Sequence, residues 1–287
     1  MNTSLKENKI ILENINFLKK ILQRKIGVDL SGYKEDFIRR RIYARMLTYG
    51  ITDINQYLNL LEKNNEEKRK LLDALDINVS QFFRDFFVWK IVKERVVKEL
   101  VEHMVKRKVS IKIWSAGCAH GQEPYSIAML VVEVCKELNV NPLVKIYATD
   151  IDDDALKKAK LGFYNHQEVK DVPYFLLKEY FQHEDGGYWI KDNIRNLVFF
   201  RKHDLIKDPP LLFVNTIFCR NVFIYFDREN QNKILSKFYQ CLYKPAYLIL
   251  GASENLWSEG NNLFEIVDNR AKIYRKKLDS NKFTNVF

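Results

Sequence analysis

From residue 111 onward, short apolar runs alternate with stretches of helical spacing, and this rhythm constrains the fold more than any other feature of the sequence. The apolar runs have the length of strands and lie at 111–115, 144–149, 197–201, 216–219 and 247–250. Helices are expected between them at 123–138, 153–161 and 227–242. Strands that alternate with helices predict an α/β fold, in which a mostly parallel sheet has helices on both faces. Residues 263–267 and 271–275 are expected to close this sheet as an antiparallel hairpin.

The first 77 residues carry no strand signal and predict a small helical domain. Apolar residues recur at helical spacing in two expected helices, as Ile11, Ile15, Leu18 and Leu22 in the first and as Ile38, Ile42, Met46 and Tyr49 in the second. The second helix is expected at 34–49, with Gly50 as its stop signal. Two shorter helices are expected at 53–62 and 66–76.

The chain is therefore expected to have three parts. They are a helical domain at 1–77, a junction with an amphipathic linker helix at 78–108, and an α/β domain at 109–287. Residues 163–196 interrupt the strand–helix rhythm and contain the turn Asp185-Gly186-Gly187. We interpret this segment as an inserted β-subdomain, partly a small antiparallel sheet.

Composition narrows the class of protein. The 287 residues include four cysteines that lie far apart, so neither a CxxC metal site nor a disulfide framework is indicated, and reduced thiols of a cytoplasmic protein are expected. The start of the chain lacks a signal peptide, and the most apolar stretch, 127–135, is too short to span a bilayer, so no membrane insertion is expected. The formal net charge of +10 favours acidic partners such as nucleic acid, anionic lipid or an acidic protein surface, although a soluble basic surface is an equally simple explanation.

The stretch WSAGCAHGQEP (114–124) leads from the first expected strand through a glycine loop into a helix. Gly117 allows the backbone to approach a ligand closely, and ligands of open α/β sheets bind beyond the carboxyl ends of the strands. The loop is neither a GxGxxG fingerprint nor a P-loop. By itself it fits a structural tight turn as well as a ligand site.

Asp150 ends the second expected strand. An acid at this place can accept both hydrogen bonds of a ribose diol, although it lies further from Gly117 than the spacing of about 20 residues in dinucleotide sites. The alternative is a helix N-cap. Asp152 or Asp153 can fill that role, which would leave Asp150 free for a ligand. The loop and the acid together favour a nucleoside site.

Two further stretches carry polar side chains that suit a ligand. NVSQFFRD (78–85) places Arg84 after an aromatic pair that we expect in the core. Arg84 is either a surface ion pair with Asp85 or an arginine that holds a carboxylate at the domain junction. CRNVFIYFD (219–227) follows the fourth expected strand, and its Tyr225 either offers a hydroxyl to the site or is half-buried packing.

Together these motifs resemble the chemotaxis receptor methyltransferase family, CheR, and the resemblance extends from about residue 10 to about residue 277. Its most specific parts are NVSQFFRD (78–85), AGCAHGQEPYSIAM (116–129), YATDID (147–152), FCRNVFIYFD (218–227) and GASENL (251–256). The resemblance implies a Rossmann-like class I methyltransferase sheet with an N-terminal all-α domain and a β-subdomain insertion. It also implies S-adenosylmethionine as cofactor, no metal, and protein-glutamate O-methyltransferase activity on methyl-accepting chemotaxis receptors.

The same resemblance implies the residues of the site. The residues implied to bind the cofactor are Asn78, Ser80, Arg84, Glu123, Asp150, Asp204, Leu205, Arg220 and Asn221. Asp150 would bind the ribose, and Asp204 and Leu205 would lie near the adenine. Arg84 and Tyr225 match the residues nearest the methyl-transfer centre and form the expected catalytic pair.

The substrate surface is expected on the helix at 34–49, where Arg41 and Arg45 lie one turn apart. A solvated basic face explains these arginines too, but the resemblance implies docking onto an acidic, glutamate-rich helical region of a receptor. The turn at 184–187 is shorter than the glycine-bearing loop of members that bind a receptor's C-terminal tether peptide, which argues against tether binding here.

Two other functions fit parts of the pattern. An RNA methyltransferase of the same core fold would need a basic, aromatic platform, and Arg220-Asn221-Val222 does not resemble an NPPY-type motif, so no nucleic acid partner is expected. A glutamate substrate is already ionised at pH 7 and needs no general base, which agrees with histidines that fall in no triad-like motif. An inactive adaptor that binds cofactor only for stability is the other alternative, against which the intact Arg84, Asp150 and Tyr225 argue.

Overall fold

The computed structural model describes residues 19, 24, 33–75 and 80–277, which fall into two compact units. One unit combines the N-terminal part up to Ile77 with the short segment Tyr225–Asn230, and the other holds Asn78–Ile224 and Gln231–Phe287. The apolar stripe of the expected first helix (Ile11, Ile15, Leu18 and Leu22) and Asn78 lie outside the described residues. Within those residues, no helix has both the length and the apolar character needed to cross a bilayer.

The helical unit contains α3 (Glu35–Thr48), α4 (Ile54–Lys63) and α5 (Asn65–Leu75), close to the expected ranges. Helix α3 buries Phe37, Ile38, Ile42 and Met46 against Tyr57, Leu61 and Leu71. The prediction that Tyr49 lies on the same buried stripe is wrong, because Tyr49 follows the last turn of α3 and is 40% exposed. Asp53 is the N-cap of α4, and its side chain accepts a hydrogen bond from the Asn55 amide at 3.0 Å.

Glu67 of α5 is a buried carboxylate that ties the three helices together. Its side chain accepts hydrogen bonds from Tyr57 of α4 at 2.6 Å and from Nε of Arg45 of α3 at 3.0 Å, and Nη2 of Arg45 binds its second oxygen. Burial disfavours the charged form of Glu67, but the hydrogen bonds from Arg45 and Tyr57 outweigh burial and lower its pKa. The helical unit therefore depends on a bidentate ion pair that the sequence pattern did not reveal.

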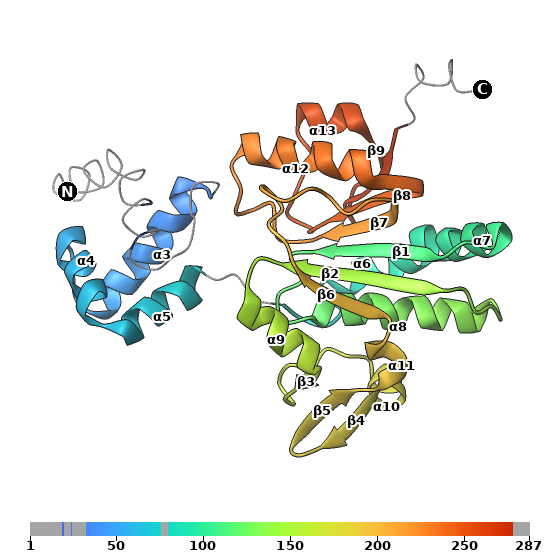
Figure 1. The fold of residues 1–287 in the computed structure, drawn as a ribbon, viewed down its shortest axis with the longest axis horizontal. Coiled ribbons are helices and arrows are strands. Elements are labelled where there is room, and N and C mark those ends of the chain that lie inside the picture. The colour runs from blue at the N-terminus through green and yellow to red at the C-terminus, as the bar shows by residue number, and fades with distance from the viewer. Residues whose placement is uncertain (1–18, 20–23, 25–32, 76–79, 278–287) are drawn as a thin grey trace. The chain divides into compact units, whose positions relative to one another are not determined.

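The second unit is built on a seven-stranded sheet (Figure 1). In spatial order its strands are β6 (Val198–Lys202), β2 (Val144–Asp150), β1 (Ile111–Ala116), β7 (Val214–Cys219), β8 (Leu242–Leu250), β10 (Ile273–Lys276) and β9 (Phe264–Asp268). The first five are parallel, and the last two pair antiparallel. Strand order runs outward from β1 in both directions, so a topological switch point lies between β1 and β7. The predicted mostly parallel sheet with a closing antiparallel hairpin is confirmed.

Helices cover both faces of this sheet (Figure 1). They are α6 (Phe86–Val92), α7 (Lys98–Arg107), α8 (Gln122–Glu137), α9 (Asp153–Leu161), α12 (Arg228–Cys241) and α13 (Ser258–Leu263). On one face Trp114 of β1 packs against Phe238 of α12, with ring centroids 5.2 Å apart. On the other, Trp89 of α6 stacks on Phe218 of β7 at 5.9 Å.

The linker helix is not one regular helix. A π-helical turn (Lys93–Val97) lies between α6 and α7 and buries the neighbouring side chains of Val96 and Val97. One amphipathic helix was expected within 78–108, and the wider π-helical turn interrupts its 3.6-residue period.

A second sheet fills the insertion with β3 (Phe163–Tyr164), β5 (Gly187–Ile190) and β4 (Phe181–Glu184), in that order and antiparallel, together with α10 (Tyr174–Tyr180) and α11 (Asp192–Arg195). Asp185 and Gly186 connect β4 to β5 with φ of 54° and 74°, the positive values of a two-residue hairpin turn. Phe82 of the junction packs between Tyr164 and Phe181, with ring centroids 4.8 and 5.5 Å away. The expected small antiparallel sheet and the buried aromatic pair are thus present.

We predict that Arg45→Ala destabilises the helical unit by about 3 kcal/mol, because it leaves the Glu67 carboxylate buried without its cation. The pKa of Glu67 is lowered in the folded state, so its ion pair stabilises above the ordinary value near 4.5 and is lost as the pH falls. Urea unfolding at neutral and acidic pH measures both effects. Arg39→Ala is the matched control, since it removes an exposed pair with Asp36 in the same helix. Equal stability of the two variants would contradict the structural role of Arg45.

Candidate active site

The glycine loop between β1 and α8 is shaped by backbone conformations that few side chains tolerate. Gly117 and Gly121 have φ of 80° and 90°, and Ala119 between them has φ of 46°. A Cβ on Gly117 would lie 2.6 Å from Cγ2 of Val222, in the segment that follows β7. The loop therefore needs glycine at Gly117 both for its φ and for the close approach of the neighbouring segment.

The carboxyl end of β2 holds this loop in place. The amides of Gly117 and Cys118 both donate to the Thr149 carbonyl, at 2.8 and 3.0 Å. The Ala119 amide donates to Oδ2 of Asp150 at 2.8 Å. From the inserted sheet, the Tyr164 hydroxyl donates to the His120 carbonyl at 2.7 Å. Strand, loop and insertion are thus bonded into one support at the tips of the parallel strands.

Asp150 is more engaged than the sequence suggested. Asp152 caps α9, with a bond from the Asp154 amide at 2.8 Å, as one of the two expected alternatives. Asp150 is not free, however, because Oδ1 accepts from the Asp152 amide at 3.1 Å while Oδ2 binds Ala119. Each carboxylate oxygen retains acceptor capacity for a second donor, such as a ribose hydroxyl. Burial raises the pKa of Asp150, and the two backbone hydrogen bonds oppose that rise.

Glu123 is a second acid at the strand tips, in the first turn of α8. Its Oε1 accepts a hydrogen bond from the Ser115 hydroxyl of β1 at 2.8 Å. Burial raises the pKa of Glu123 to about 7, although the positive charge of Arg220 and the bond from Ser115 pull it down. A carboxyl group in this state gains from a cationic ligand that replaces the lost hydration.

Arg220 follows β7 and lies among these acids. Its side chain is buried, forms an ion pair with Asp85 at 2.8 Å, and places Cζ 5.6 Å from the ring centroid of Trp89. The Asp85 carboxylate, considered above as a partner of Arg84, thus binds Arg220. Burial lowers the pKa of Arg220, and the negative charge of Glu123 opposes this.

Six buried side-chain polar atoms of the sheet unit have no hydrogen-bond partner among the described residues, and three of them lie together near the strand tips: Oε1 of Gln122, Nε of Arg220 and Oδ1 of Asn221. They flank the glycine loop and the segment after β7. Buried polar atoms are satisfied in the great majority of folded proteins, so a group of them indicates a polar ligand. Two acceptors and one donor, next to the acids Glu123 and Asp150, suit a ligand with an ammonium group, hydroxyls and a carboxylate.

Glu254 is a residue of the site to which the sequence pattern assigned no role. It follows β8, is 4% exposed, and accepts hydrogen bonds from the amides of Asn221 at 2.9 Å, Gly251 at 2.6 Å and Ile224 at 3.2 Å. It therefore fixes the backbone of Asn221, whose φ is 61°. The signal for it was the acid after the glycine of GASENL, a motif that was used only for the family resemblance.

Asp204 and Leu205 lie in the turn after β6. The His203 amide donates to the Asp150 carbonyl at 2.9 Å, which brings this turn to the same edge of the sheet. Oδ1 of Asp204 accepts from the amides of Ile206 and Lys207, at 2.8 and 3.1 Å, and so closes its own turn. Leu205 is buried. Their contact with an adenine stays a prediction.

The junction segment is bonded to α8. The Phe83 amide donates to the Ser126 hydroxyl at 3.1 Å, and that hydroxyl donates to the Gln122 carbonyl at 2.7 Å. Arg84 follows directly, and its positive charge acts on both Glu123 and Arg220. Ser80 is half-buried. Arg84 is therefore close enough to Glu123 and Arg220 to influence their charges, and its role in cofactor binding stays a prediction.

Tyr225 belongs to the helical unit, whereas Arg84 belongs to the sheet unit. The Tyr225 carbonyl accepts a hydrogen bond from the Lys34 amide at 2.8 Å, and its ring lies 5.1 Å from that of Phe37. Tyr225 is half-buried, in agreement with the packing alternative. Its pairing with Arg84 in catalysis stays a prediction.

The two arginines expected on the docking surface differ in their surroundings. Arg41 is exposed and lies over the Phe37 ring, with Cζ 5.4 Å from the centroid. Arg45 is held by Glu67. Around Arg41, α3 also exposes Arg40, Tyr43 and Leu47, which recur at helical spacing. A docking role for Arg45 stays a prediction, with its guanidinium already bound inside the unit.

Known families match both units. The model of the CheR methyltransferase SAM binding domain matches residues 78–273, and that of the CheR methyltransferase all-alpha domain matches residues 13–75. A chemotaxis protein methyltransferase of Borreliella burgdorferi is 35% identical over 93% of this chain and 97% of its own. Proteins of the same name are 33% identical in Escherichia coli, over 83% and 82% of the two chains, and 33% identical in Vibrio anguillarum, over 90% and 94%. The chain belongs to the CheR methyltransferase family.

Proposed function

We propose that this protein is an S-adenosylmethionine-dependent protein-glutamate O-methyltransferase that modifies chemotaxis receptors. The observation that carries the proposal is the set of unpaired buried atoms on Gln122, Arg220 and Asn221 beside the acids Glu123 and Asp150. The match to a SAM binding domain and the names of the related chemotaxis protein methyltransferases support it.

The residues present fit this cofactor group by group. Asp150 would accept the ribose hydroxyls, Glu123 would neutralise the ammonium group, and Arg220 would donate from Nε to the carboxylate. Asn221 and Gln122 would accept from the remaining donors. When bound, the cofactor supplies a methyl group on a positively charged sulfur.

The protein's own part in the reaction is to position an ionised glutamate and exclude water. The carboxylate of a free glutamate has a pKa near 4.3, so no residue has to remove a proton. Charge is neutralised as the methyl group moves, so strong solvation of the carboxylate slows the step and its removal helps. Arg84 would either orient the substrate carboxylate loosely or hold the carboxylate of the cofactor. A tight grip on the substrate carboxylate would stabilise the ground state and so slow the reaction. Tyr225 would position one oxygen through a single hydrogen bond.

We expect Arg84→Ala and Tyr225→Phe each to lower turnover on the order of 100-fold while the protein stays folded, because each removes a group that orients the reactants. The assay is incubation with radiolabelled S-adenosylmethionine and membranes from the source cell, followed by mild base. Label released as methanol identifies a carboxyl ester. Arg95→Ala, which changes an exposed arginine of the π-helical turn, is the control.

Other outcomes of that assay distinguish the alternatives. Wild-type initial rates for both variants would remove Arg84 and Tyr225 from the mechanism. Base-stable label on RNA would favour an RNA methyltransferase. Cofactor binding with no labelled product under any condition would favour an inactive adaptor.

The raised pKa of Glu123, about 7, predicts that cofactor affinity increases with pH through the neutral range. Below pH 7 the carboxyl group of the free protein is protonated and must lose its proton before it can pair with an ammonium group, so affinity falls, at most roughly tenfold per pH unit. Calorimetric titrations with the demethylated product measure this dependence. Glu123→Gln should bind more weakly and with a flatter pH profile. An identical profile for both proteins would contradict this role of Glu123.

We propose further that α3 docks onto an acidic helical region of the receptor through Arg41 and the exposed side chains Arg40, Tyr43 and Leu47. Arg41→Glu should raise the apparent KM for receptor severalfold and leave cofactor affinity unchanged, because it reverses one charge of the interface. Steady-state rates at increasing receptor concentration and at two salt concentrations test this. Lys63→Glu, at the end of α4, is the control for net charge. An unchanged KM would place receptor recognition elsewhere.

A further inference from the structure

At the amino-terminal ends of its strands, opposite the cofactor residues, the large sheet exposes a row of large apolar side chains. They are Val109, Leu143, Leu212, Phe213 and Tyr243, and each is between 48% and 65% exposed. Four of them belong to the connections that lead into β1, β2 and β7, and Tyr243 is the second residue of the neighbouring strand β8. We call this set the apolar edge.

The apolar edge is continuous because the strands that it precedes are hydrogen-bonded neighbours. The Ile111 amide donates to the Leu143 carbonyl at 2.8 Å, which joins the entries to β1 and β2. Asn215 near the start of β7 accepts from the Lys112 amide at 2.9 Å and donates to the Tyr243 carbonyl at 3.4 Å. The rings of Phe213 and Tyr243 lie 6.4 Å apart.

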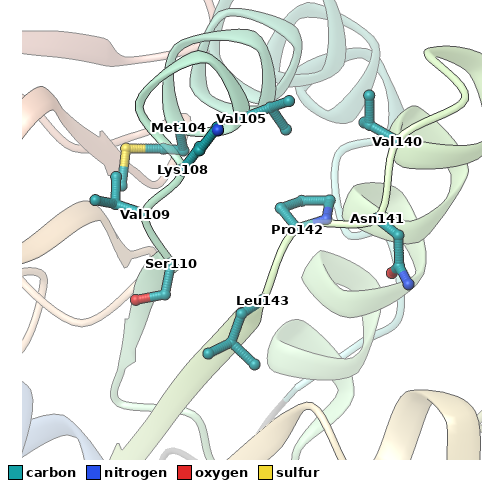
Figure 2. Close-up of a pocket in the computed structure, with 9 residues that line it drawn as sticks. All are labelled: Met104, Val105, Lys108, Val109, Ser110, Val140, Asn141, Pro142 and Leu143. Atoms are coloured by element: carbon teal, nitrogen blue, oxygen red, sulfur yellow. The ribbon is translucent and has the colours of Figure 1, made fainter.

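A hollow of about 400 Å³ opens within this edge (Figure 2). Figure 2 shows Lys108, Val109 and Ser110 on one side of it and Pro142 and Leu143 on the other. The edge is thus a surface of apolar projections and a shallow recess rather than a flat face.

The residues nearest the starts of these strands carry positive charge. Residues 105–110, 139–143, 209–213 and 242–245 contain four exposed cations, Lys106, Arg107, Lys108 and Lys244, and no aspartate or glutamate. The earlier part of the connection into β7 adds Asp204 and Asp208 beside Lys207, so the whole surface keeps a net positive charge. This composition is complementary to an anionic occupant that also offers apolar material. It disfavours a second copy of this chain, because a two-fold contact would oppose the same four cations.

The backbone of Phe213, within the apolar edge, is strained. Phe213 has φ of 57°, in the left-handed region that bulky residues rarely occupy, and its side chain is 64% exposed. Because Phe213 is exposed, burial in the core does not offset this strain. Strain at an exposed aromatic residue points to a role outside the folded chain itself.

We propose that the apolar edge attaches the protein peripherally to an anionic lipid surface. Apolar side chains enter the boundary between headgroups and acyl chains, and the flanking cations pair with lipid phosphates, the combination by which soluble proteins hold to such membranes. The edge lies at the opposite ends of the strands from Asp150 and Glu123, so attachment leaves the cofactor residues accessible. The inference does not depend on the identity of the methyl acceptor.

Sedimentation of the full-length protein with phosphatidylcholine vesicles, with and without phosphatidylglycerol, tests the proposal. We expect binding only to the anionic vesicles, and weaker binding at high salt. Leu212→Ser with Phe213→Ser, and separately Lys106→Glu with Lys108→Glu, should each weaken binding by more than roughly tenfold. The matched control is Tyr174→Ser with Phe175→Ser, which removes two residues of α10 that are 74% and 61% exposed.

Several results would overturn the proposal. They are no binding to anionic vesicles, equal losses in the α10 control, or unchanged binding in both edge variants. A dimer in light scattering that dissociates in the Leu212/Phe213 variant would assign the edge to a second copy instead. Calorimetric binding of the demethylated cofactor by each variant shows that it is folded, since these substitutions lie at the far end of the strands.

Discussion

The tie between the end of β2 and the glycine loop is the interaction on which the site depends. Thr149 accepts two loop amides through its carbonyl, and Asp150 accepts a third through its side chain. The loop has residues with positive φ and little regular hydrogen bonding of its own, so these bonds define its path. The same carboxylate is the expected ligand of the ribose. The Asp150 side chain therefore both supports the glycine loop and is the expected ribose ligand, so its removal would disturb the loop and the binding site together.

A second constraint is the concentration of charge at the strand tips. Glu123, Asp150 and Glu254 all have a raised pKa because they are buried, and Arg220 among them has a lowered one. Each shift means that the protein alone solvates these charges incompletely. Glu254 offsets its burial with backbone amides. Among the described residues, Glu123 accepts a hydrogen bond from Ser115, whereas Glu254 accepts three from backbone amides, so Glu123 gains more from a cation.

The spacing of apolar and turn residues along the sequence predicted the secondary structure and the type of sheet. The strand–helix alternation gave the sheet, its closing hairpin and the inserted sheet, and the turn residues gave the tight connection at Asp185-Gly186. Pairings between distant residues were out of reach: Arg220 with Asp85, Arg45 with Glu67, and Glu254 with the amides after β7. Nothing in the spacing of these residues encodes their contact, because only the assembled fold brings them together. The same limit explains why the sequence left Asp150 free of backbone bonds.

The short segment Tyr225–Asn230 groups with the N-terminal helices although it lies between two parts of the sheet unit. Phe226 forms a β-bridge with Tyr33, and Asp227 caps the start of α12 by accepting from the Asn230 amide at 2.9 Å. A single cut in the chain therefore cannot separate the two units cleanly. A fragment ending at Ile77 would lack a strand partner for Tyr33, and its complement would expose Phe226, so dissection of this protein requires a graft of six residues rather than a truncation.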